Sequence, residues 1–271
     1  NESDQLVVWG ASFTNHTGLA PYKPIIQVDD AARALGRFHP LAVPVHGDVG
    51  VTAAALAEAL PADVAAIDQR PDVSDRGHIW REETRSRVAD DRGEGVGSAA
   101  VFDALGRHVA SDAVLCADVG NNAYSFGRYF EVAHQSVLMS GYLGSIGFAL
   151  PAALGAWAAV GENRQVVAIA GDGGFGQYAM ELLTAVRHDM DITVVLLDNS
   201  ELGKISKEQR AGQFDVWQTS MVSPDFAQFA RICGAFAVTV GAASELDAAL
   251  SAALGHRGPA LVHVLADVTL V

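Results

Sequence analysis

Cysteine and positive charge are scarce in this chain of 271 residues. Its two cysteines, Cys116 and Cys233, lie far apart, which indicates neither a disulfide framework nor a zinc site and suits the reducing cytoplasm. Only 18 Lys and Arg stand against 32 Asp and Glu, and the net charge of −14 disfavours nucleic acid as a partner. No apolar run reaches the roughly 18 residues that a membrane span needs, and no signal peptide is recognisable. We therefore expect a cytoplasmic protein that binds neither membranes nor nucleic acids.

Half of the chain is apolar and glycine is abundant, with 27 residues, a composition typical of an α/β protein of one or two domains. We predict a first module over residues 1–74, a charged linker helix over 75–95, and a second module of alternating helices and strands over 96–271. In the first module we predict strands at residues 6–10, 24–28 and 43–46. We predict helices at 31–35, between the second and third strands, and at 52–60.

The most informative stretch is an apolar run, 166–170, that breaks into a glycine-rich turn and then continues with a helical pattern. This pattern predicts a strand that leads into a phosphate-binding helix N-terminus. A second apolar run, 192–197, predicts a neighbouring parallel strand that ends at Asp198 and Asn199. Asp172, in the turn, and Asn199 would then lie at carboxyl strand ends, where open α/β sheets bind ligands. Carboxylate and amide oxygens beside backbone N–H groups favour Mg²⁺ and a diphosphate.

The glycines of this turn, Gly171, Gly173 and Gly176, also fit a dinucleotide-binding fingerprint, with Asp198 as the acid that binds a ribose. The glycines alone do not separate the two interpretations. Asp172 favours the metal site, because a carboxylate between the first two glycines would repel a pyrophosphate unless a divalent cation lay between them. A third interpretation is an ordinary strand–turn–helix unit in which Asp172 is only a capping residue.

The Gly-Asp-Gly turn at 171–173, followed by Asn199, resembles the cofactor motif of thiamine diphosphate-dependent enzymes. The resemblance implies a three-layer αβα fold around a parallel sheet. It also implies that the side chains of Asp172 and Asn199 and the main-chain oxygen of Glu201 hold Mg²⁺. Asp198 departs mildly from the family, which often has a second asparagine at this position.

A second segment, 140–151, has the sequence SGYLGSIGFALP and is similar to the part of acetolactate synthases and pyruvate oxidases that binds the cofactor's aminopyrimidine. The resemblance implies that Gly144 offers its carbonyl to the 4′-amino group, that Ser145 contacts the cofactor and that Ile146 bends it. Bending makes the activating proton transfer intramolecular, which gains from proximity. Without the downstream motif, Ile146 would indicate plain core packing.

Two further segments complete the implied site. Residues 118–122 follow a predicted strand and match the loop over the diphosphate, although alone they would indicate only a turn. After Asn199 comes a match to the helix beside the substrate, with Glu208 at the position of an acid in pyruvate oxidases. Lys204 departs from flavin-containing relatives, which often have an aromatic residue there, and this puts electron transfer to a flavin in doubt. The other implied cofactor contacts are Gly120, Asn121, Asn122, Gly171, Gly173, Gly174, Leu202 and Gly203.

The first module is similar to the last part of the middle domain of these enzymes. In flavin-containing members, acids that match Asp29 and Asp48 lie near the adenosine of FAD, so FAD is considered as a further cofactor of a full-length protein. Nothing in the chain resembles the pyrimidine-binding domain, whose glutamate activates the cofactor. The resemblance implies that this domain comes from a missing N-terminal half or from another chain, within a homodimer or homotetramer, and that the chain alone is inactive.

Together these expectations predict a thiamine diphosphate- and Mg²⁺-dependent decarboxylation of a 2-oxo acid, with pyruvate as the expected substrate, followed by oxidation or carboligation. The chain would supply the diphosphate-binding half of the active site. Two alternatives of other classes stay open: a non-catalytic cofactor-binding or assembly subunit, and a dinucleotide-binding oxidoreductase that uses the same glycines.

Overall fold

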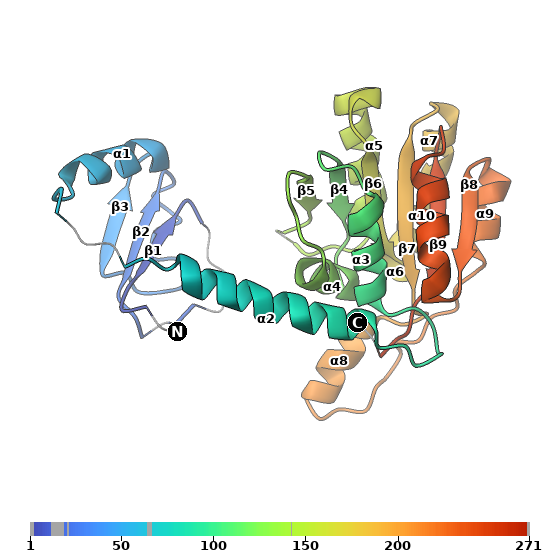
Figure 1. Cartoon of the computed structure of the whole chain (residues 1–271), viewed down its shortest axis with the longest axis horizontal. Coiled ribbons are helices and arrows are strands. Elements are labelled where there is room, and N and C mark those ends of the chain that lie inside the picture. The colour runs from blue at the N-terminus through green and yellow to red at the C-terminus, as the bar shows by residue number, and fades with distance from the viewer. Residues whose placement is uncertain (1–2, 12–18, 21, 64–66, 142, 270–271) are drawn as a thin grey trace. The chain divides into compact units, whose positions relative to one another are not determined.

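The structure, a computed structural model, describes residues 3–11, 19–20, 22–63, 67–141 and 143–269. The chain forms two compact units, residues 1–71 and 72–271 (Figure 1). Tyr142, part of the predicted aminopyrimidine segment, lies outside the described residues.

The first unit contains a parallel sheet with the strand order β1-β2-β3 in its described part. The strands are Leu6–Trp9, Ile25–Asp29 and Val43–His46, close to the predicted ranges. β2 is the central and buried strand, whereas the side chains of β3 are largely exposed. Helix α1 (Val49–Ala59) follows, and none of its residues, all of which are described, is buried. The core of this unit is therefore small.

The predicted helix at 31–35 is wrong, because the structure has a series of turns there. The side chain of the buried Gln27 explains the difference. Its Oε1 accepts a hydrogen bond from the Gly36 N–H (3.0 Å), and its Nε2 donates to the Ala34 carbonyl (3.2 Å). Gly36 also has a φ of 68°, which a helix does not allow. The backbone groups that a helix would pair within itself are thus bound by a side chain of the neighbouring strand.

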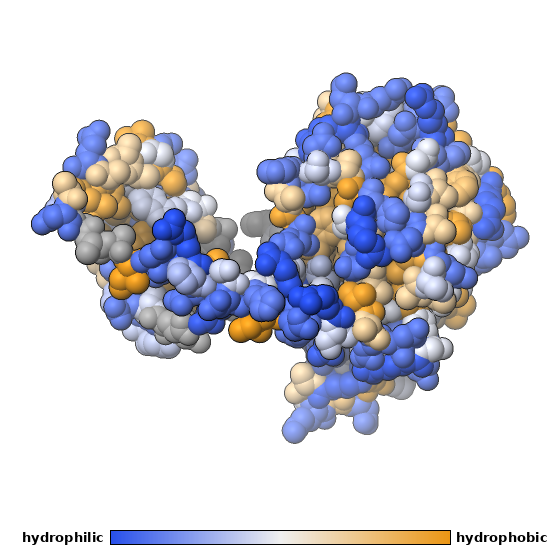
Figure 2. Space-filling view, in the orientation of Figure 1, coloured by the Kyte–Doolittle hydropathy of each residue, from blue (hydrophilic) through white to orange (hydrophobic). Residues whose placement is uncertain are grey.

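Helix α2 (Arg70–Val88) covers most of the segment predicted as a charged linker helix, but it ends before residue 95. Its residues are hydrophilic on the face shown in Figure 2, and none of them is buried. Polar contacts connect it to the end of helix α4 (Asn121–Tyr129). Trp80 Nε1 donates to the Arg128 carbonyl at 2.8 Å, and Arg81 pairs with Glu131 at 2.8 Å.

The second unit is built on a parallel sheet with the strand order β5-β4-β6-β7-β9-β8 in its described residues. In chain order, the strands β4 to β9 are Val114–Ala117, Ser136–Met139, Val166–Gly171, Ile192–Asp198, Phe236–Val240 and Ala260–Leu265. β9 lies between β7 and β8, so the last strand of the chain inserts beside β7.

Helices cover both faces of this sheet and complete a three-layer αβα fold, as predicted (Figure 1). Helices α3, α4 and α10 pack on one face, at Ser98–His108, Asn121–Tyr129 and Leu246–Leu254. Helices α5, α6, α7 and α9 pack on the other face, at Ala149–Val160, Asp172–Tyr178, Leu182–Arg187 and Phe226–Cys233. Helix α8 (Gly203–Ala211) lies at the carboxyl edge of the sheet.

The central strands are apolar along their whole length because helices cover both faces of the sheet. Along β6, Val167 and Ile169 belong to the core cluster with α3 and α10, and Val166, Ala168 and Ala170 to the cluster on the opposite face. A strand buried on both faces has no polar face to alternate with. Each large core side chain contributes about 1.5–3 kcal/mol through burial.

The strand order opens a crevice at the carboxyl edge. From β4 the chain proceeds to β5 on one side, while β6 and β7 lie on the other side of β4. The helices that follow β4 and β6 therefore pack on opposite faces, and the loops that lead to them diverge. Open α/β sheets bind ligands at this kind of switch point. Among the helices of the described ranges, none combines the length and the apolar character that a membrane crossing needs.

Candidate functional site

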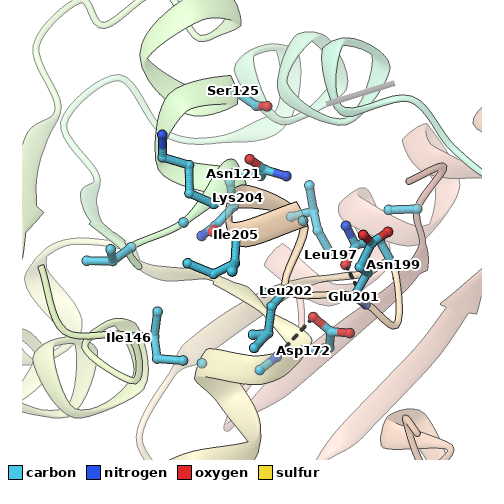
Figure 3. A pocket seen from close by; sticks show the side chains of 18 of the residues that line it. Asn121, Ser125, Ile146, Asp172, Leu197, Asn199, Glu201, Leu202, Lys204 and Ile205 are labelled. Atoms are coloured by element: carbon cyan, nitrogen blue, oxygen red, sulfur yellow. Dashed lines mark hydrogen bonds between the residues drawn. The ribbon is translucent and has the colours of Figure 1, made fainter. Parts of the chain in front are cut away.

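A pocket of about 360 Å³ lies at the carboxyl ends of β4, β6 and β7 (Figure 3). Its volume is in the range of small-molecule sites. Nearly all of the residues predicted for the cofactor and for catalysis line it, and these are Gly120, Asn121, Asn122, Gly144, Ile146, Gly171, Asp172, Gly173, Gly174, Asn199, Glu201, Leu202, Gly203 and Glu208. Ser145 is the exception: it is exposed, and its hydroxyl contacts the Ile146 carbonyl at 3.3 Å. Figure 3 shows Asp172, Asn199 and Glu201 on one side of the pocket and Ile146 on the other.

Asp172 is a buried carboxylate with few donors. Its Oδ1 accepts from the Gly173 N–H at 2.9 Å, and Ser223 Oγ lies 3.3 Å from its Oδ2. Burial raises the pKa of Asp172, and the neighbouring charge of Asp198 raises it further. Ionised Asp172 is thus poorly compensated by the protein itself, and a divalent cation would stabilise it.

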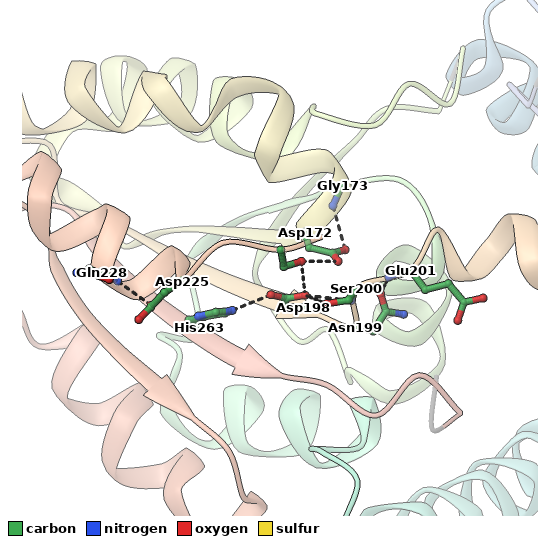
Figure 4. Close-up of polar contacts among 10 residues, drawn as sticks. Asp172, Gly173, Asp198, Asn199, Ser200, Glu201, Asp225, Gln228 and His263 are labelled. Carbon is green, nitrogen blue, oxygen red and sulfur yellow. Dashed lines mark hydrogen bonds and ion pairs between the residues drawn. The ribbon is translucent and has the colours of Figure 1, made fainter. Parts of the chain in front are cut away.

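Asp198, the last residue of β7, has much better partners (Figure 4). Its Oδ2 lies 2.9 Å from His263 Nε2, and its Oδ1 accepts from Ser223 Oγ at 2.8 Å and from the Ser200 N–H at 3.0 Å. Burial alone would raise the pKa of Asp198, but the hydrogen bonds from His263 and Ser223 outweigh it and lower the pKa. Of the two neighbouring acids, Asp198 therefore carries the charge more readily.

The loop after β7 brings Asn199 and Glu201 to the pocket. Asn199 Oδ1 accepts from the Glu201 N–H at 3.2 Å, which closes a tight turn. Ser200, inside this turn, has a φ of 51°, which residues with a side chain rarely adopt. The Met221 N–H donates to the Ser200 carbonyl (2.8 Å) and holds the turn from outside. In the described ranges, no three His, Cys, Asp or Glu side chains gather as metal ligands, so a cation here would need the amide and carbonyl oxygens as well.

The two asparagines after β4 differ in what they contact. Asn122 is buried, and its Nδ2 lies 3.3 Å from the carbonyl oxygens of Asp118 and Ile169, so it ties the ends of β4 and β6 together. Asn121 Nδ2 is buried without a hydrogen-bond partner among the described residues. Such an unpaired donor is costly unless a ligand accepts from it. Of the two, Asn121 is the residue with a free donor for a bound anion.

Asp118 organises the segment predicted to bind the aminopyrimidine, 140–151, a role that sequence reasoning missed. Its carboxylate, at the end of β4, accepts from the N–H groups of Gly147 (2.9 Å), Phe148 (3.3 Å) and Ala149 (3.3 Å). These donors lie at the start of helix α5, so the acid fixes the segment that carries Gly144 and Ile146. A signal for it was present, because an acid directly after a buried apolar run points into the carboxyl edge of the sheet.

Comparison with known proteins agrees with this geometry. Residues 118–264, more than half of the chain, match the family described as thiamine pyrophosphate enzyme, C-terminal TPP binding domain. The chain belongs to the thiamine pyrophosphate enzymes. It carries their C-terminal TPP-binding domain, and TPP is thiamine diphosphate. The match decides between the two interpretations of the glycine-rich turn in favour of thiamine diphosphate and against a dinucleotide.

Individual relatives extend over both units. A protein of Bacillus subtilis (strain 168), described as thiamine pyrophosphate-containing, is 32% identical over 97% of this chain and 46% of its own length. The large subunit of acetolactate synthase isozyme 2 from Escherichia coli (strain K12) is 29% identical over 98% of this chain and 48% of its own length. The large subunit of acetolactate synthase from Corynebacterium glutamicum is 29% identical over 93% of this chain and 42% of its own length. The chain thus spans about half the length of the curated relatives it matches.

The residues of the TPP-binding domain fit the cofactor in two respects. A Cβ on Gly203 would lie 2.4 Å from Asn121 Nδ2, and a Cβ on Gly173 would lie 3.1 Å from Leu202 Cδ2, so these glycines allow the close approach of chain segments at the pocket. The unpaired Asn121 donor and the poorly compensated Asp172 then offer one group for a diphosphate and one for its cation.

Lys204 and Glu208, on helix α8, form the mouth of the pocket. Their side chains pair at 2.9 Å, and Lys204 Nζ also lies 4.8 Å from the centre of the Tyr124 ring. The hydrogen bond with Glu208 raises the pKa of Lys204, so the ammonium stays charged. Lys204 also lines an adjoining cavity of about 750 Å³, together with Arg128 and Lys207. Other residues that line the first pocket lay outside every motif: Ser98, Ser125 and Ala266.

Proposed function

We propose that this chain supplies the diphosphate-binding half of an enzyme that decarboxylates a 2-oxo acid, with pyruvate as the expected substrate, using thiamine diphosphate and Mg²⁺. Oxidation or carboligation of the remaining fragment follows. The observation that carries the proposal is the convergence of Asp172, Asn199 and Glu201 at the switch-point pocket of a TPP-binding domain. The names of the acetolactate synthase relatives favour carboligation.

The residues that would hold the cofactor follow from the pocket. We assign Mg²⁺ to the side-chain oxygens of Asp172 and Asn199 and to the main-chain oxygen of Glu201. The diphosphate would accept a hydrogen bond from the unpaired Asn121 Nδ2. When bound, thiamine diphosphate supplies a carbon nucleophile and stores the electron pair that the departing CO₂ leaves behind.

The remaining residues orient the reactants and exclude water. The carbonyl of Gly144 and the side chain of Ile146 would position the pyrimidine, and Asp118 holds their segment in place through its contacts with the start of α5. Lys204 would bind the carboxylate or another anionic group of a substrate at the mouth, since its ammonium faces both cavities. Glu208 orients Lys204 through their ion pair.

The metal assignment is tested by Asp172→Ala with calorimetry. Loss of the carboxylate should weaken Mg²⁺-dependent binding of thiamine diphosphate by more than about 100-fold, because the cation loses its charged ligand. The circular dichroism spectrum should stay native. Asp112→Ala is the matched control, since Asp112 is an exposed acid just before β4, at the opposite edge of the sheet. Undiminished cofactor binding by Asp172→Ala would refute the assignment.

A second candidate function is a cofactor-binding or assembly subunit without catalysis. The pocket supports this candidate, because both glutamates that line it have other assignments. Glu201 lies in the proposed metal loop, and Glu208 pairs with Lys204. If the chain instead belongs to an enzyme, the acid that activates the cofactor comes from a pyrimidine-binding domain in a longer chain or in a partner, within a homodimer or homotetramer. An activity assay with that domain supplied separates the two functions, and no CO₂ release even then would support the non-catalytic subunit. We expect little CO₂ release from pyruvate by this chain alone, and release at an enzymatic rate once such a domain is supplied. Release by the chain alone would contradict this division.

The visible absorbance and the reaction product of the complete enzyme separate oxidation from ligation. FAD is proposed only for a full-length protein. In this chain the carboxylates of Asp29 and Asp48, which would lie near its adenosine, accept from the N–H groups of Ala31 and Val51 at 2.8 Å. We expect a colourless protein that forms acetolactate. Stoichiometric flavin that bleaches with pyruvate would show instead that the fragment is oxidised.

A further inference from the structure

We propose that His263, acting through Asp198, is a positioning residue for the turn that supplies Asn199 and Glu201 to the candidate metal site. The inference rests on the proposed function for what the turn binds, but its structural part concerns this chain alone. No motif included His263, and no role in the proposed chemistry has used it so far.

His263 lies on β9, beside the end of β7, and is 4% exposed. Its Nε2 lies 2.9 Å from Asp198 Oδ2, so the ring must carry its proton on Nε2 to donate this bond. The ring of Phe226 packs edge-on against it, with centroids 5.6 Å apart. Nδ1 is buried with no hydrogen-bond partner in the described part of the chain. The orientation of the ring therefore serves the bond to Asp198.

Asp198, held by His263, in turn fixes the backbone at Ser200. While His263 holds Oδ2, Oδ1 accepts from both the backbone N–H (3.0 Å) and the hydroxyl (3.2 Å) of Ser200. Ser200 has its φ at 51°, and a non-glycine residue keeps such a conformation only where surrounding contacts impose it. The clamp on Ser200 is such a contact, and it depends on a fixed rotamer of Asp198.

The turn at residues 199–201 positions the proposed metal ligands. Asn199 and Glu201 flank Ser200, and the Glu201 N–H is bound to Asn199 Oδ1. Ser223 Oγ joins the network to the other side of the site, because it lies 2.8 Å from Asp198 Oδ1 and 3.3 Å from Asp172 Oδ2. A rotation of Asp198 would therefore shift the amide oxygen and the carbonyl oxygen relative to Asp172. Residues that orient metal ligands in this way typically change metal affinity by about 10–100-fold.

Four variants of the chain test the proposal. His263→Leu removes the donor, and His263→Gln restores an N–H at a similar reach. The control, Thr193→Val, removes a buried side-chain hydrogen bond, from Thr193 Oγ1 to the Ala253 carbonyl at 3.3 Å, at the opposite end of β7. The fourth variant combines His263→Leu with Ser200→Gly, because glycine adopts a positive φ without the clamp.

Two measurements are made on each variant. Amide hydrogen exchange of Ser200 and Glu201, without any cofactor, reports on the turn itself. The Mg²⁺ concentration needed for half-maximal binding of thiamine diphosphate reports on the metal ligands. For His263→Leu we expect exchange at both amides and the Mg²⁺ requirement to rise by about tenfold or more. His263→Gln and the double variant should recover most of the Mg²⁺ affinity, and Thr193→Val should change neither quantity.

Unchanged exchange at Ser200 and Glu201 in His263→Leu would overturn the proposal, whatever the chain binds. Equal effects of Thr193→Val and His263→Leu would overturn it too, because they would show a loss of general stability. If the unchanged chain does not bind thiamine diphosphate with Mg²⁺, the proposed function fails, while the exchange measurement still decides the positioning. Should His263→Leu not fold, Asp198→Asn breaks the same link, since an amide has one acceptor oxygen, which cannot serve both His263 and the Ser200 N–H.

Discussion

The two units of this chain both use parallel strands, yet they put the acids at the strand ends to different use. In the first unit, Asp29 is the last residue of β2, and its carboxylate accepts from the N–H of Ala31, two residues away. In the second unit, Asp118 reaches the start of helix α5, some 30 residues away along the chain, and Asp198 reaches His263 on another strand. The difference lies in the elements that surround the strand ends, because the acids themselves are similarly buried: Asp29 is 7% exposed and Asp198 is 6% exposed. A strand end surrounded by other elements offers distant donors to an acid, whereas a half-exposed sheet offers only local ones.

The cores differ in the same sense. The buried apolar residues of the first unit in its described part are Ile25 and Val28, whereas the second unit has two large clusters, one on each face of its sheet. A parallel sheet is stable when both faces are covered. The candidate site is therefore in the unit whose sheet can hold strand ends rigidly.

The largest expected effect contrasts a buried side chain of the second unit with an exposed side chain of the first. Phe102→Ala should destabilise the second unit by about 3–5 kcal/mol, because the side chain is 1% exposed and packs edge-on against Phe126. Val51→Ala in helix α1 should change stability by less than about 0.5 kcal/mol, since Val51 is 70% exposed. Chemical denaturation measures both. A loss of similar size for both would show that helix α1 contributes more to stability than its exposure indicates.

A second experiment asks whether ligand binding, and not only stability, is confined to the second unit. Gly203→Ala should weaken binding of thiamine diphosphate by about tenfold or more, because the new Cβ meets Asn121 Nδ2. Gly36→Ala is the counterpart in the first unit. Its φ of 68° makes the alanine strained by about 1–2 kcal/mol, but the affinity for the cofactor should not change. Calorimetric titration of both variants checks this, and an affinity loss in Gly36→Ala would mean that the two units are coupled.

The smallest effect compares two helix caps of the same chemistry. Asp225 accepts from the Gln228 N–H at the start of α9, and Asp48 from the Val51 N–H at the start of α1, both at 2.8 Å. Each change to alanine should cost about 1 kcal/mol in its own helix. Amide exchange should then rise in α9 alone for Asp225→Ala and in α1 alone for Asp48→Ala. Exchange that rises in both helices for either variant would contradict the separation of the units.

Prediction from the sequence succeeded where a local pattern determines the structure. The strands β6 and β7 lie where their apolar runs predicted, and nearly all of the predicted cofactor residues line one pocket. The helix predicted at 31–35 failed, because the apolar spacing there is helical but a buried Gln27 on β2 binds the backbone groups instead. Ser145 failed to join the pocket for a similar reason: its backbone neighbours are fixed by Asp118, and its own side chain is left outside.

By itself, the sequence determined the alternation of helices and strands and the glycine-rich turn, because strand periodicity and turn chemistry act over a few residues, and its resemblance to a known family implied the αβα layers and the proposed metal ligands. Only the tertiary structure decided which acids meet which partners. Asp198 and His263 are adjacent because β9 inserts between β7 and β8, and Asp118 meets the start of α5 because β4 lies beside β6 at the switch point. Strand order depends on how the whole sheet packs, and no local pattern encodes it.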